Sequence, residues 1–475
     1  MNLPKGWVKP KLGDVITYKK GKKPKVLQNE KVENMVPYID IKAFEKGIIR
    51  QYADIESSVL VNKNDFLIVW DGARSGLTGR NMSGALGSTL MKVSALGLDN
   101  DYIFRFLQFK FDDINSNTKG IGIPHVDPAY LWNIGLPLPP LNEQKRIAQK
   151  LDILLFTVES IKTRLNNASN ILKRFRQSVL TAATSGKLTE EWRRENQTKS
   201  SIEQDILNLY KKLLLNSITT TQKKNITNIY SQQEKVLNTN HLIPKSWKFV
   251  NLAKLCKPPK YGSSSKSKEE GSVPVLRMGN IQNGKLDWNS LVFTSDENEI
   301  KKYLLEKNDV LFNRTNSPEL VGKTAIYKGE RKAIYAGYLI KITTHELLIP
   351  DYLNYILNSP YGRDYSWKVK SDGVSQSNIN AQKLGMLPVP LCSVAEQKEI
   401  VSKVESLFAL ADSIEAKIEA AQKRVDKLTQ SILAKAFRGE LVPQDPGDEP
   451  AQILLERIKA EQEAKKTKKR SKKSK

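Results

Sequence analysis

The sequence predicts an α/β protein made of two tandem copies, in which each copy joins a mixed α/β (α+β) globular part to one long helix. Three observations predict this fold class. Short motifs occur twice in the same order along 475 residues, each copy carries an unbroken heptad pattern, and strand-like runs precede each heptad stretch. The two long helices are expected to form an antiparallel coiled coil that separates the globular parts with pseudo-two-fold symmetry.

The duplication is visible in motifs that return at matching places. LPKGW near the start returns as IPKSW at Ile243, and LPLPPLNEQK at Leu136 returns as LPVPLCSVAEQK at Leu387. From Glu143 onward the register is constant, with a shift of 253 residues to Glu396. Because every later landmark keeps this shift, the chain is a tandem duplication rather than a chance similarity of short motifs.

The heptad stretches predict two long helices. Apolar or small residues recur at alternating steps of four and three over 147–179 and again over 400–432, and neither stretch contains Pro or Gly. Asn142 is predicted to cap the first helix, and Ser393 with Glu396 to form a capping box for the second. A lone helix with such a stripe would expose a long apolar face, so the two helices are expected to pack on each other.

These landmarks divide the chain into six segments. Gly186 and Gly439 stand just past the two stripes, as helix stops often do. The expected segments are the first globular part (1–141), the first long helix (142–187), a linker with one short helix (188–242), the second globular part (243–392), the second long helix (393–440) and a basic, partly disordered tail (441–475).

The charge favours a polyanionic partner. The net charge is +25, and the last eleven residues contribute eight Lys or Arg and no acid. The other 464 residues therefore still carry +17, so the excess is not confined to the tail. Such a field favours nucleic acid first and an acidic membrane surface second. For the tail alone, a solubilising charge and loose DNA contact are equally good interpretations.

Motifs of catalysis and metal binding do not occur in the sequence. It has no GxxxxGK[ST] phosphate loop, no GxSxG elbow and no Gly-rich cofactor loop between a strand and a helix. Cys256 and Cys392 match no pairing motif, and the three histidines are far apart, so neither a disulfide framework nor a metal site is expected. The N-terminus has no apolar signal core, and a cytoplasmic, non-catalytic protein without cofactors of its own is expected.

Gly- and Ser-rich loops with basic residues are the candidate DNA contacts. Arg matches guanine and Asn or Gln matches adenine in the major groove, while Lys and backbone amides suit phosphates. Ordinary surface loops remain an equally good interpretation for any one of them. The candidates are Lys19, Lys20, Lys22, Arg74, Arg80, Lys260, Ser263, Lys266, Arg314, Asn316, Lys323, Gln376 and Asn378.

The order of the motifs resembles one protein family. Two globular parts, each followed by LP-x-P…EQ and a heptad helix closing on QS[VI]L…G-x-L, are similar to the specificity subunit of type I restriction–modification systems. ILKRFRQSVL…GKLTEEWR and LTQSILAKAFRGEL are especially similar to the enteric K-12 branch. The resemblance covers nearly the whole chain. One departure is Thr184, where the second copy has the aromatic Phe437 that the motif prefers.

The resemblance implies that this chain recognises DNA and that partner subunits carry out the chemistry. Each globular part would be a target recognition domain for one half of a bipartite double-stranded DNA site. The helices would set the spacer and bind two methylation subunits, which carry S-adenosylmethionine and modify adenine. Restriction subunits with motor and nuclease activity would carry ATP and Mg. Two other interpretations stay open: a fused methyltransferase, and a basic coiled-coil DNA-binding scaffold that does not read sequence.

Overall fold

The chain forms two compact units. The computed structural model describes residues 3–63, 65–120, 122–196, 201–234 and 241–471. The first unit contains 1–166 and 419–475, and the second contains 167–418. Both long helices, α5 (Leu141–Thr184) and α13 (Val394–Phe437), contribute residues to each unit.

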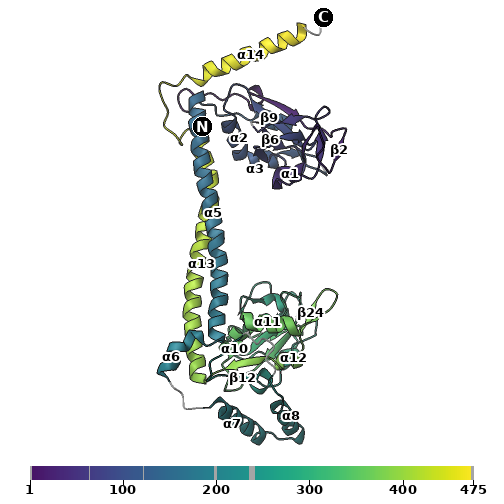
Figure 1. Ribbon diagram of the computed structural model, residues 1–475, viewed down its shortest axis with the longest axis vertical. Coiled ribbons are helices and arrows are strands. Elements are labelled where there is room, and N and C mark those ends of the chain that lie inside the picture. Colours follow the sequence, from purple (N-terminus) through teal and green to yellow (C-terminus); the bar gives the residue numbers. More distant parts are fainter. Residues whose placement is uncertain (1–2, 64, 121, 197–200, 235–240, 472–475) are drawn as a thin grey trace. The chain divides into compact units, whose positions relative to one another are not determined.

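The first globular part contains two small sheets and a hairpin. One sheet is antiparallel with the order β1-β9-β6-β7, and the other has the order β2-β4-β3-β8-β5 with β3 and β8 parallel. The strands are β1 (Ile16–Lys20), β2 (Leu27–Gln28), β3 (Met35–Ile39), β4 (Tyr52–Asp54), β5 (Leu60–Val61), β6 (Phe66–Val69), β7 (Thr78–Arg80), β8 (Gly84–Leu86), β9 (Leu90–Ala95), and the hairpin pair β10 (Thr118–Lys119) and β11 (His125–Val126). Its helices are α1 (Ile41–Lys46), α2 (Asn100–Phe109), α3 (Phe111–Ser116) and α4 (Pro128–Asn133) (Figure 1).

The second globular part repeats this plan. Its four-stranded sheet has the order β13-β22-β18-β20, and its parallel pair is β14 with β21. The strands are β12 (Lys248–Asn251), β13 (Lys260–Tyr261), β14 (Val273–Leu276), β15 (Ile281–Gln282), β16 (Lys285–Leu286), β17 (Val292–Thr294), β18 (Val310–Asn313), β19 (Thr315–Asn316), β20 (Thr324–Ile326), β21 (Ile334–Tyr335), β22 (Leu339–Ile342), β23 (Ser371–Asp372), β24 (Ser377–Asn378) and β25 (Pro388–Leu391). Its helices are α9 (Glu297–Tyr303), α10 (Pro350–Asn358), α11 (Pro360–Val369) and α12 (Ala381–Gly385).

The central strand of each four-stranded sheet is buried on both faces. Side chains alternate along a strand, so Phe66 and Ile68 of β6 join the core under α2, while Leu67 and Val69 join the core beside α1. In β18, Phe312 likewise belongs to the core that contains α10. This double burial explains why these strands read as continuous apolar runs in the sequence.

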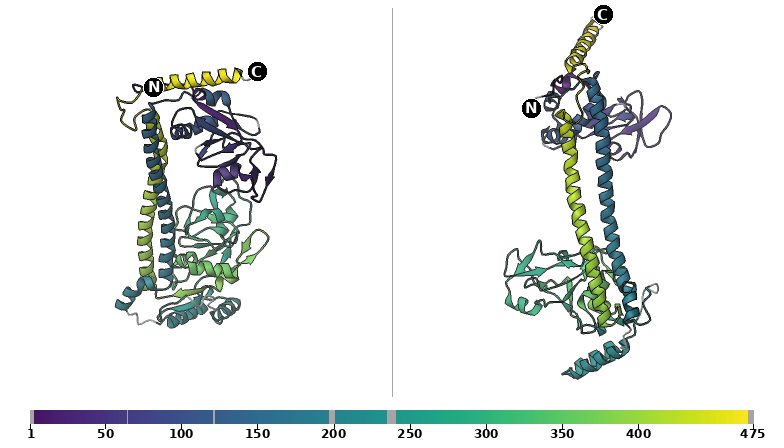
Figure 2. Two further views of the ribbon diagram at one scale, coloured as in Figure 1. Left: turned by 45° about the horizontal axis from the view of Figure 1, so that its top comes forward. Right: turned by 90° about the vertical axis from the view of Figure 1, so that its left-hand side faces the viewer.

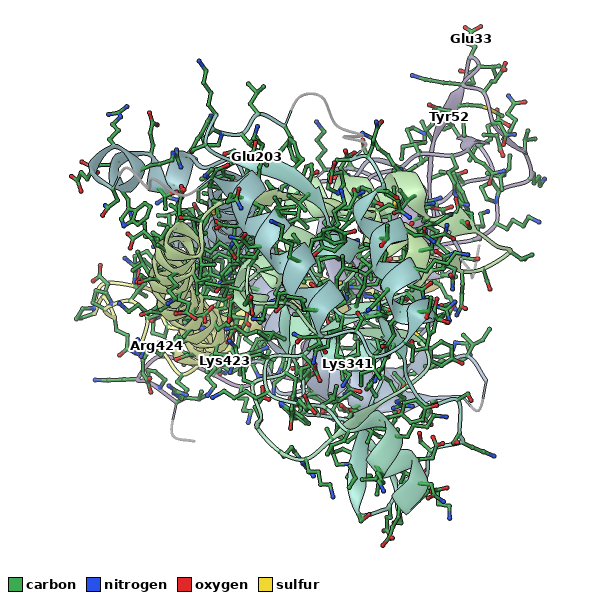
Figure 3. The ribbon with its side chains drawn as sticks, turned by 90° about the horizontal axis from the view of Figure 1, so that it is seen from below. Glu33, Tyr52, Glu203, Lys341, Lys423 and Arg424 are labelled. Carbon is green, nitrogen blue, oxygen red and sulfur yellow. The ribbon has the colours of Figure 1, made fainter. Side chains whose placement is uncertain are left out.

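The two long helices lie side by side within each unit (Figure 2). In the first unit Lys162 pairs with Asp426 at 3.0 Å, and in the second Arg176 pairs with Asp412 at 2.6 Å. Higher numbers on α5 thus meet lower numbers on α13, which makes the pair antiparallel, as the pseudo-two-fold symmetry of a duplicated chain predicted. Lys423 and Arg424 of α13 (labelled in Figure 3) are exposed, as expected for positions outside the stripe.

Half of the stripe positions are buried, and most of the others are partly buried. Val158, Leu172, Val179, Ile400, Val404, Ala411, Ile418 and Val425 are each less than 9% exposed. Ile161, Ile414 and Leu428 remain partly open, because a seam of only two helices covers a narrow strip of each.

The caps of the two long helices differ from the predicted caps in two details. Helix α5 begins at Leu141, and Gln144 N donates to Pro140 O at 2.9 Å, so Asn142 lies inside the first turn and is not the cap. Ser393 does cap α13 by accepting from Glu396 N at 3.2 Å, but the Glu396 side chain does not complete a box. It turns toward the globular part instead.

The repeated tryptophan and glutamate motifs contact each other. Trp7 Nε1 donates to Glu143 Oε2 at 3.0 Å, and Trp247 Nε1 donates to Glu396 Oε2 at 2.9 Å. All four residues are buried. The [LI]PK[GS]W motif therefore recurs together with EQ because the indole fixes the carboxylate at the start of each long helix.

The neighbouring glutamines join each long helix to its globular part. Gln144 Oε1 accepts from Asp99 N at 3.0 Å, ahead of α2. In the second copy Gln397 Oε1 accepts from Ile349 N at 2.8 Å, ahead of α10. Both amides are fully buried and satisfied by backbone groups, so a side chain of this length and chemistry is required.

The linker differs from the expected single short helix. After Gly186, which has φ +74°, the chain forms α6 (Glu190–Glu195), α7 (Ile202–Leu215) and α8 (Thr220–Tyr230). Helix α8 was missed because its sequence is polar; it is fixed by a Thr219 capping box and by Tyr210 and Tyr230, whose ring centroids lie 4.8 Å apart. The linker residues 197–200 and 235–240 lie outside the described residues.

Part of the basic tail is helical, and its last residues, 472–475, lie outside the described residues. Residues Ala451–Ser471 form helix α14, and Ala451, Leu454, Leu455 and Ile458 are buried in the core of the first unit. These residues make a helical stripe that the charge of the following residues had obscured. No helix of the described residues is long and apolar enough to cross a membrane.

Candidate nucleic-acid interface

A polar cluster in the second globular part brings together residues that are distant in sequence. The Arg314 guanidinium lies over the Tyr261 ring, with Cζ 4.6 Å from the ring centroid. Arg314 Nη2 donates to Asn378 Oδ1 at 3.3 Å, and Asn378 Nδ2 donates to Thr315 Oγ1 at 2.7 Å. Stacking and hydrogen bonding thus hold a planar, charged fork in one orientation before any ligand binds.

Short strands position this cluster. β19 pairs with β24, so Asn316 faces Ser377, and Ile379 N donates to Arg314 O at 2.9 Å. The β23–β24 hairpin ends in an exposed turn in which Gly373 N donates to Gln376 O at 2.8 Å. Four predicted residues, Arg314, Asn316, Gln376 and Asn378, therefore lie on one small sheet and its turn.

The first globular part has a polar cluster at the equivalent place, built from different side chains. Lys20 Nζ lies 3.0 Å from Asp71 Oδ2, and His125 Nδ1 lies 2.7 Å from Asp71 Oδ1. His125 is on β11, and Val126 N donates to Trp70 O at 2.9 Å just as Ile379 does to Arg314. A lysine, a carboxylate and an imidazole thus stand where the second copy has Tyr261, Thr315 and Asn378.

Several other predicted residues remain available at the surface. Arg74 is 58% exposed in its side chain, although Nη1 lies 3.1 Å from Glu45 Oε1. Lys323 is half-buried with Nζ 3.4 Å from Gln282 Oε1; burial first, and the nearby Arg363 second, lower the pKa of its ammonium group. The remaining exposed candidates are Lys19, Lys22, Lys260 and Lys266.

Arg80 is not the loop residue that the sequence indicated. It lies on β7, contacts Asp101 and places Nη2 3.1 Å from Asp152 on α5. Arg105 binds the same Asp152 carboxyl. Partial burial acts to raise the pKa of Asp152, but the two arginines outweigh it and the pKa is lowered. Arg80 therefore ties the first globular part to the start of α5, because its guanidinium is already engaged by carboxylates.

Ser263 is a second correction. It is 5% exposed, its hydroxyl contacts Glu299, and its backbone N donates to Tyr335 O at 2.9 Å. Gly262 precedes it, and a Cβ there would lie 2.3 Å from Tyr335 O. The glycine thus marks a close backbone approach that draws the serine into the fold, whereas the sequence had indicated an exposed loop.

Tyr261, Asp71 and His125 were missed by the sequence reasoning. From the sequence, the three histidines are considered only as possible metal ligands, and Lys260 and Ser263 are selected on either side of Tyr261 but the tyrosine itself is not. A usable signal was the repeat itself, because β11 and β24 occupy equivalent places in the two copies. The sequence gives no periodic pattern for β11 or β24, because each strand has only two residues.

The side chains of these clusters suit contacts with DNA bases and phosphates. Arg with Asn on a rigid hairpin is a pairing that suits base edges, and the surrounding lysines suit phosphates. Among the described residues, no group of three or more His, Cys, Asp or Glu side chains is arranged to hold a metal ion.

Comparison with known proteins assigns the fold to a family. The family model described as "Type I restriction modification DNA specificity domain" matches residues 4–170 and 244–423, one match for each copy. The chain therefore belongs to the type I restriction–modification DNA specificity family, and it is a specificity subunit of this class.

Individual relatives are similar in sequence to this chain over most of its length. It is 36% identical to the type I restriction enzyme EcoKI specificity subunit of Escherichia coli K12 over 373 residues, 76% of this chain and 71% of the relative. It is 32% identical to the Escherichia coli EcoBI specificity subunit over 458 residues, 92% and 88% of the two chains. The resemblance to this enteric branch is thus confirmed.

Solved structures confirm the fold. A chain from a study of complex assembly and conformational transition of the type I R-M system aligns with a TM-score of 0.66 at 19% identity, covering 93% of this chain and all of that one. The HsdS subunit from Thermoanaerobacter tengcongensis aligns with a TM-score of 0.53 at 18% identity, covering 93% and 99%.

Proposed function

We propose that each globular part reads one half of a bipartite duplex DNA target. The observation that supports this is the occurrence of two hairpin-based clusters at equivalent places in the duplicated fold. Each presents polar side chains from a strand pair, which is a rigid platform for reading base edges. The basic excess spread over the chain supplies the sequence-independent attraction to phosphates.

The two half-sites should differ in sequence. Arg314 with Asn378 favours purine edges in one half, whereas the Lys20–Asp71–His125 cluster offers a different set of donors and acceptors in the other. A duplicated fold with unlike clusters is expected to read an asymmetric target rather than a palindrome.

The long helices are proposed to set the spacer between half-sites and to dock two methylation subunits. Those partners would bring S-adenosylmethionine, and restriction subunits would bring ATP and Mg, so this chain would direct reactions that it does not catalyse. The antiparallel seam and its ion pairs support a rigid spacer.

Selection from random duplexes tests the proposal. The chain is mixed with its methylation subunits, and bound duplexes are sequenced. Two separate short motifs at one fixed spacing are expected. Equal recovery of all duplexes at physiological salt would support the non-specific basic scaffold instead.

Methylation assays test the proposed lack of catalysis. The purified chain alone should transfer no methyl group from S-adenosylmethionine to target DNA, and adding the methylation subunit should confer transfer to adenine. Methyl transfer by the chain alone would favour the fused methyltransferase.

A further inference from the structure

The hairpin of β23 and β24 ends in an exposed apolar side chain. Gly373 N donates to Gln376 O at 2.8 Å, so the loop beyond this bond consists of Val374 and Ser375 alone. Residues 371–376 are all exposed, and Val374 is the most exposed of the large hydrophobic residues in the described part of the chain. The tip of the hairpin therefore holds an apolar side chain in water.

Polar bonds hold the stem of this hairpin in one shape. Lys370 Nζ lies 2.5 Å from Asp372 Oδ1, and the Ser377 hydroxyl contacts the same carboxylate. Lys383 Nζ of α12 donates to Ser371 Oγ at 2.7 Å. Because both strands are fixed in this way, the exposed tip is presented on a rigid stem. Lys370 also offsets the charge of Asp372, which would otherwise repel a phosphate backbone.

An exposed apolar side chain also occurs on the matching hairpin of the first copy. Residues 118–126 correspond to 371–379 with the same shift of 253 residues that relates the long helices. The turn of this first hairpin carries Ile123, which is 62% exposed and lies two residues beyond the position that corresponds to Val374. The two turns differ in sequence but share this feature, so it is not peculiar to one loop.

A narrow hairpin with an apolar tip matches the major groove of DNA. That groove admits a two-stranded β-ribbon, and the C5-methyl group of thymine is the apolar feature that the base edges present there. The neighbours of Val374 in the chain are Gly373 and Ser375, whose small size leaves the approach to a base edge open. A valine side chain neither donates nor accepts a hydrogen bond, so it gains nothing from phosphates and favours this methyl group.

Its place on the hairpin distinguishes Val374 from an ordinary exposed apolar residue. Single exposed apolar side chains are common on protein surfaces. Val374, however, shares its hairpin with Asn378, which accepts from Arg314 Nη2 at 3.3 Å in the candidate interface. Asn378 pairs with Ser371, three residues before Val374. At about 3.3 Å per residue the two levels lie up to about 10 Å apart, or about three base pairs of DNA.

We propose that Val374 contacts the C5-methyl group of a thymine within about three base pairs of the position that Arg314 and Asn378 contact. This inference rests on the proposed function, because the same half-site is read. The contact lets the second globular part distinguish a T·A pair from an A·T pair and from G·C pairs, since the methyl group belongs to one strand only.

Duplexes that contain deoxyuridine test the contact in the complex with the methylation subunits. Selection with Arg314→Ala first locates the position that Arg314 contacts. Each thymine within about three base pairs of it, on either strand, is then replaced by deoxyuridine, which lacks only the methyl group. Binding by the intact protein is compared with binding by Val374→Ala and by Ile218→Ala, a control at a residue that is 92% exposed between α7 and α8.

One deoxyuridine replacement should weaken binding by the intact protein about fourfold, the effect expected for the loss of one buried methyl group. Val374→Ala should bind the thymine duplex more weakly by at least this factor, and it should bind the thymine and deoxyuridine duplexes equally. Ile218→Ala should keep the preference of the intact protein for thymine.

A Val374→Ala protein that keeps the full preference for thymine would overturn the proposal, as would an intact protein that tolerates every deoxyuridine. Weaker binding of the methylation subunits by that variant, with its thymine preference unchanged, would assign the tip to a protein contact instead. An equal loss by Val374→Ala on target and scrambled duplexes would also overturn the proposal, because a wedge between base pairs needs no methyl group.

The same measurements separate this inference from the proposed function. If the intact complex binds target and scrambled duplexes equally, the proposed function fails and the inference fails with it. If the complex discriminates between them but its preference for thymine does not depend on Val374, only the inference fails.

Discussion

The two equivalent glutamates at the starts of the long helices should respond differently to the same substitution. Glu396 accepts from Trp247, from Thr189 Oγ1 at 2.8 Å and from Arg193. Glu143 accepts from Trp7, but its Oε1 is buried without a hydrogen-bond partner among the described residues.

The cause of this difference lies in the segment after each long helix. At the shift of 253 residues, Thr189 corresponds to Val442 and Arg193 to Pro446. The first unit therefore lacks the hydroxyl and the guanidinium that serve Glu396 in the second. Burial raises the pKa of Glu143, and the Trp7 bond with the charge of Arg146 only partly offsets it.

Glu396→Gln should destabilise the protein by about 3 kcal/mol, because removing one partner of a buried ion pair costs about 3–5 kcal/mol. The loss of stability should lie at the lower end of this range, since Arg193 keeps a hydrogen bond to Gly186 O at 2.7 Å and lies over Trp247. Glu143→Gln should change stability by less than about 1 kcal/mol. It removes a poorly compensated charge, but it leaves an amide N–H without an acceptor.

The contribution of Glu143 to folding stability should also depend on pH. Because the pKa of Glu143 is raised on folding, the folded state holds its proton longer, and its contribution to stability falls as pH rises from about 4.3 through the folded pKa. Glu143→Gln should abolish this fall.

Urea unfolding between pH 4 and pH 8, monitored by tryptophan fluorescence, measures the loss of stability in each variant and how it depends on pH. Glu159→Gln, at an exposed position of α5, is the matched control and should stay within about 0.5 kcal/mol of the intact protein. Equal destabilisation by Glu143→Gln and Glu396→Gln would refute the reasoning.

Three further predictions concern the DNA target and the long helices. Arg314→Ala should cost about 1–3 kcal/mol in target binding and relax one position of one half-site, as measured by selection from randomised duplexes; a uniform loss on all sequences would indicate a phosphate contact instead. Inserting seven residues at matching points of both long helices should lengthen each by about 10 Å and widen the preferred spacer by about three base pairs, unless the added turn of the DNA abolishes binding. Inserting three residues in one helix should lower the thermal unfolding midpoint instead, because it moves apolar stripe residues into water.

The fold could be predicted from sequence because its signals are long-range and repeated. Heptads spanning more than thirty residues fix helix type, and a constant register fixes the correspondence between copies. Helix α8 and the docked face of α14 were missed for a physical reason. Polar caps, ring contacts and a four-residue apolar stripe stabilise them locally, and surrounding charge conceals such short signals.

The candidate interface was less predictable because it depends on strands of two residues. Composition located Arg314 and Asn378 but gave no indication that Tyr261 would stack on the guanidinium. It also could not distinguish a free arginine from Arg80, which carboxylates on two other helices engage. Whether a basic side chain is free depends on tertiary neighbours, and spacing along the chain does not encode them.

If the proposed function is right, the two globular parts read separate half-sites. Its most direct test is a map of methylated adenines in cells that carry this chain with its partner subunits, repeated after residues 243–386 are replaced by the matching domain of a relative. The target should be bipartite, and the replacement should change one half while the other half and the spacer stay the same. A change in both halves would contradict it.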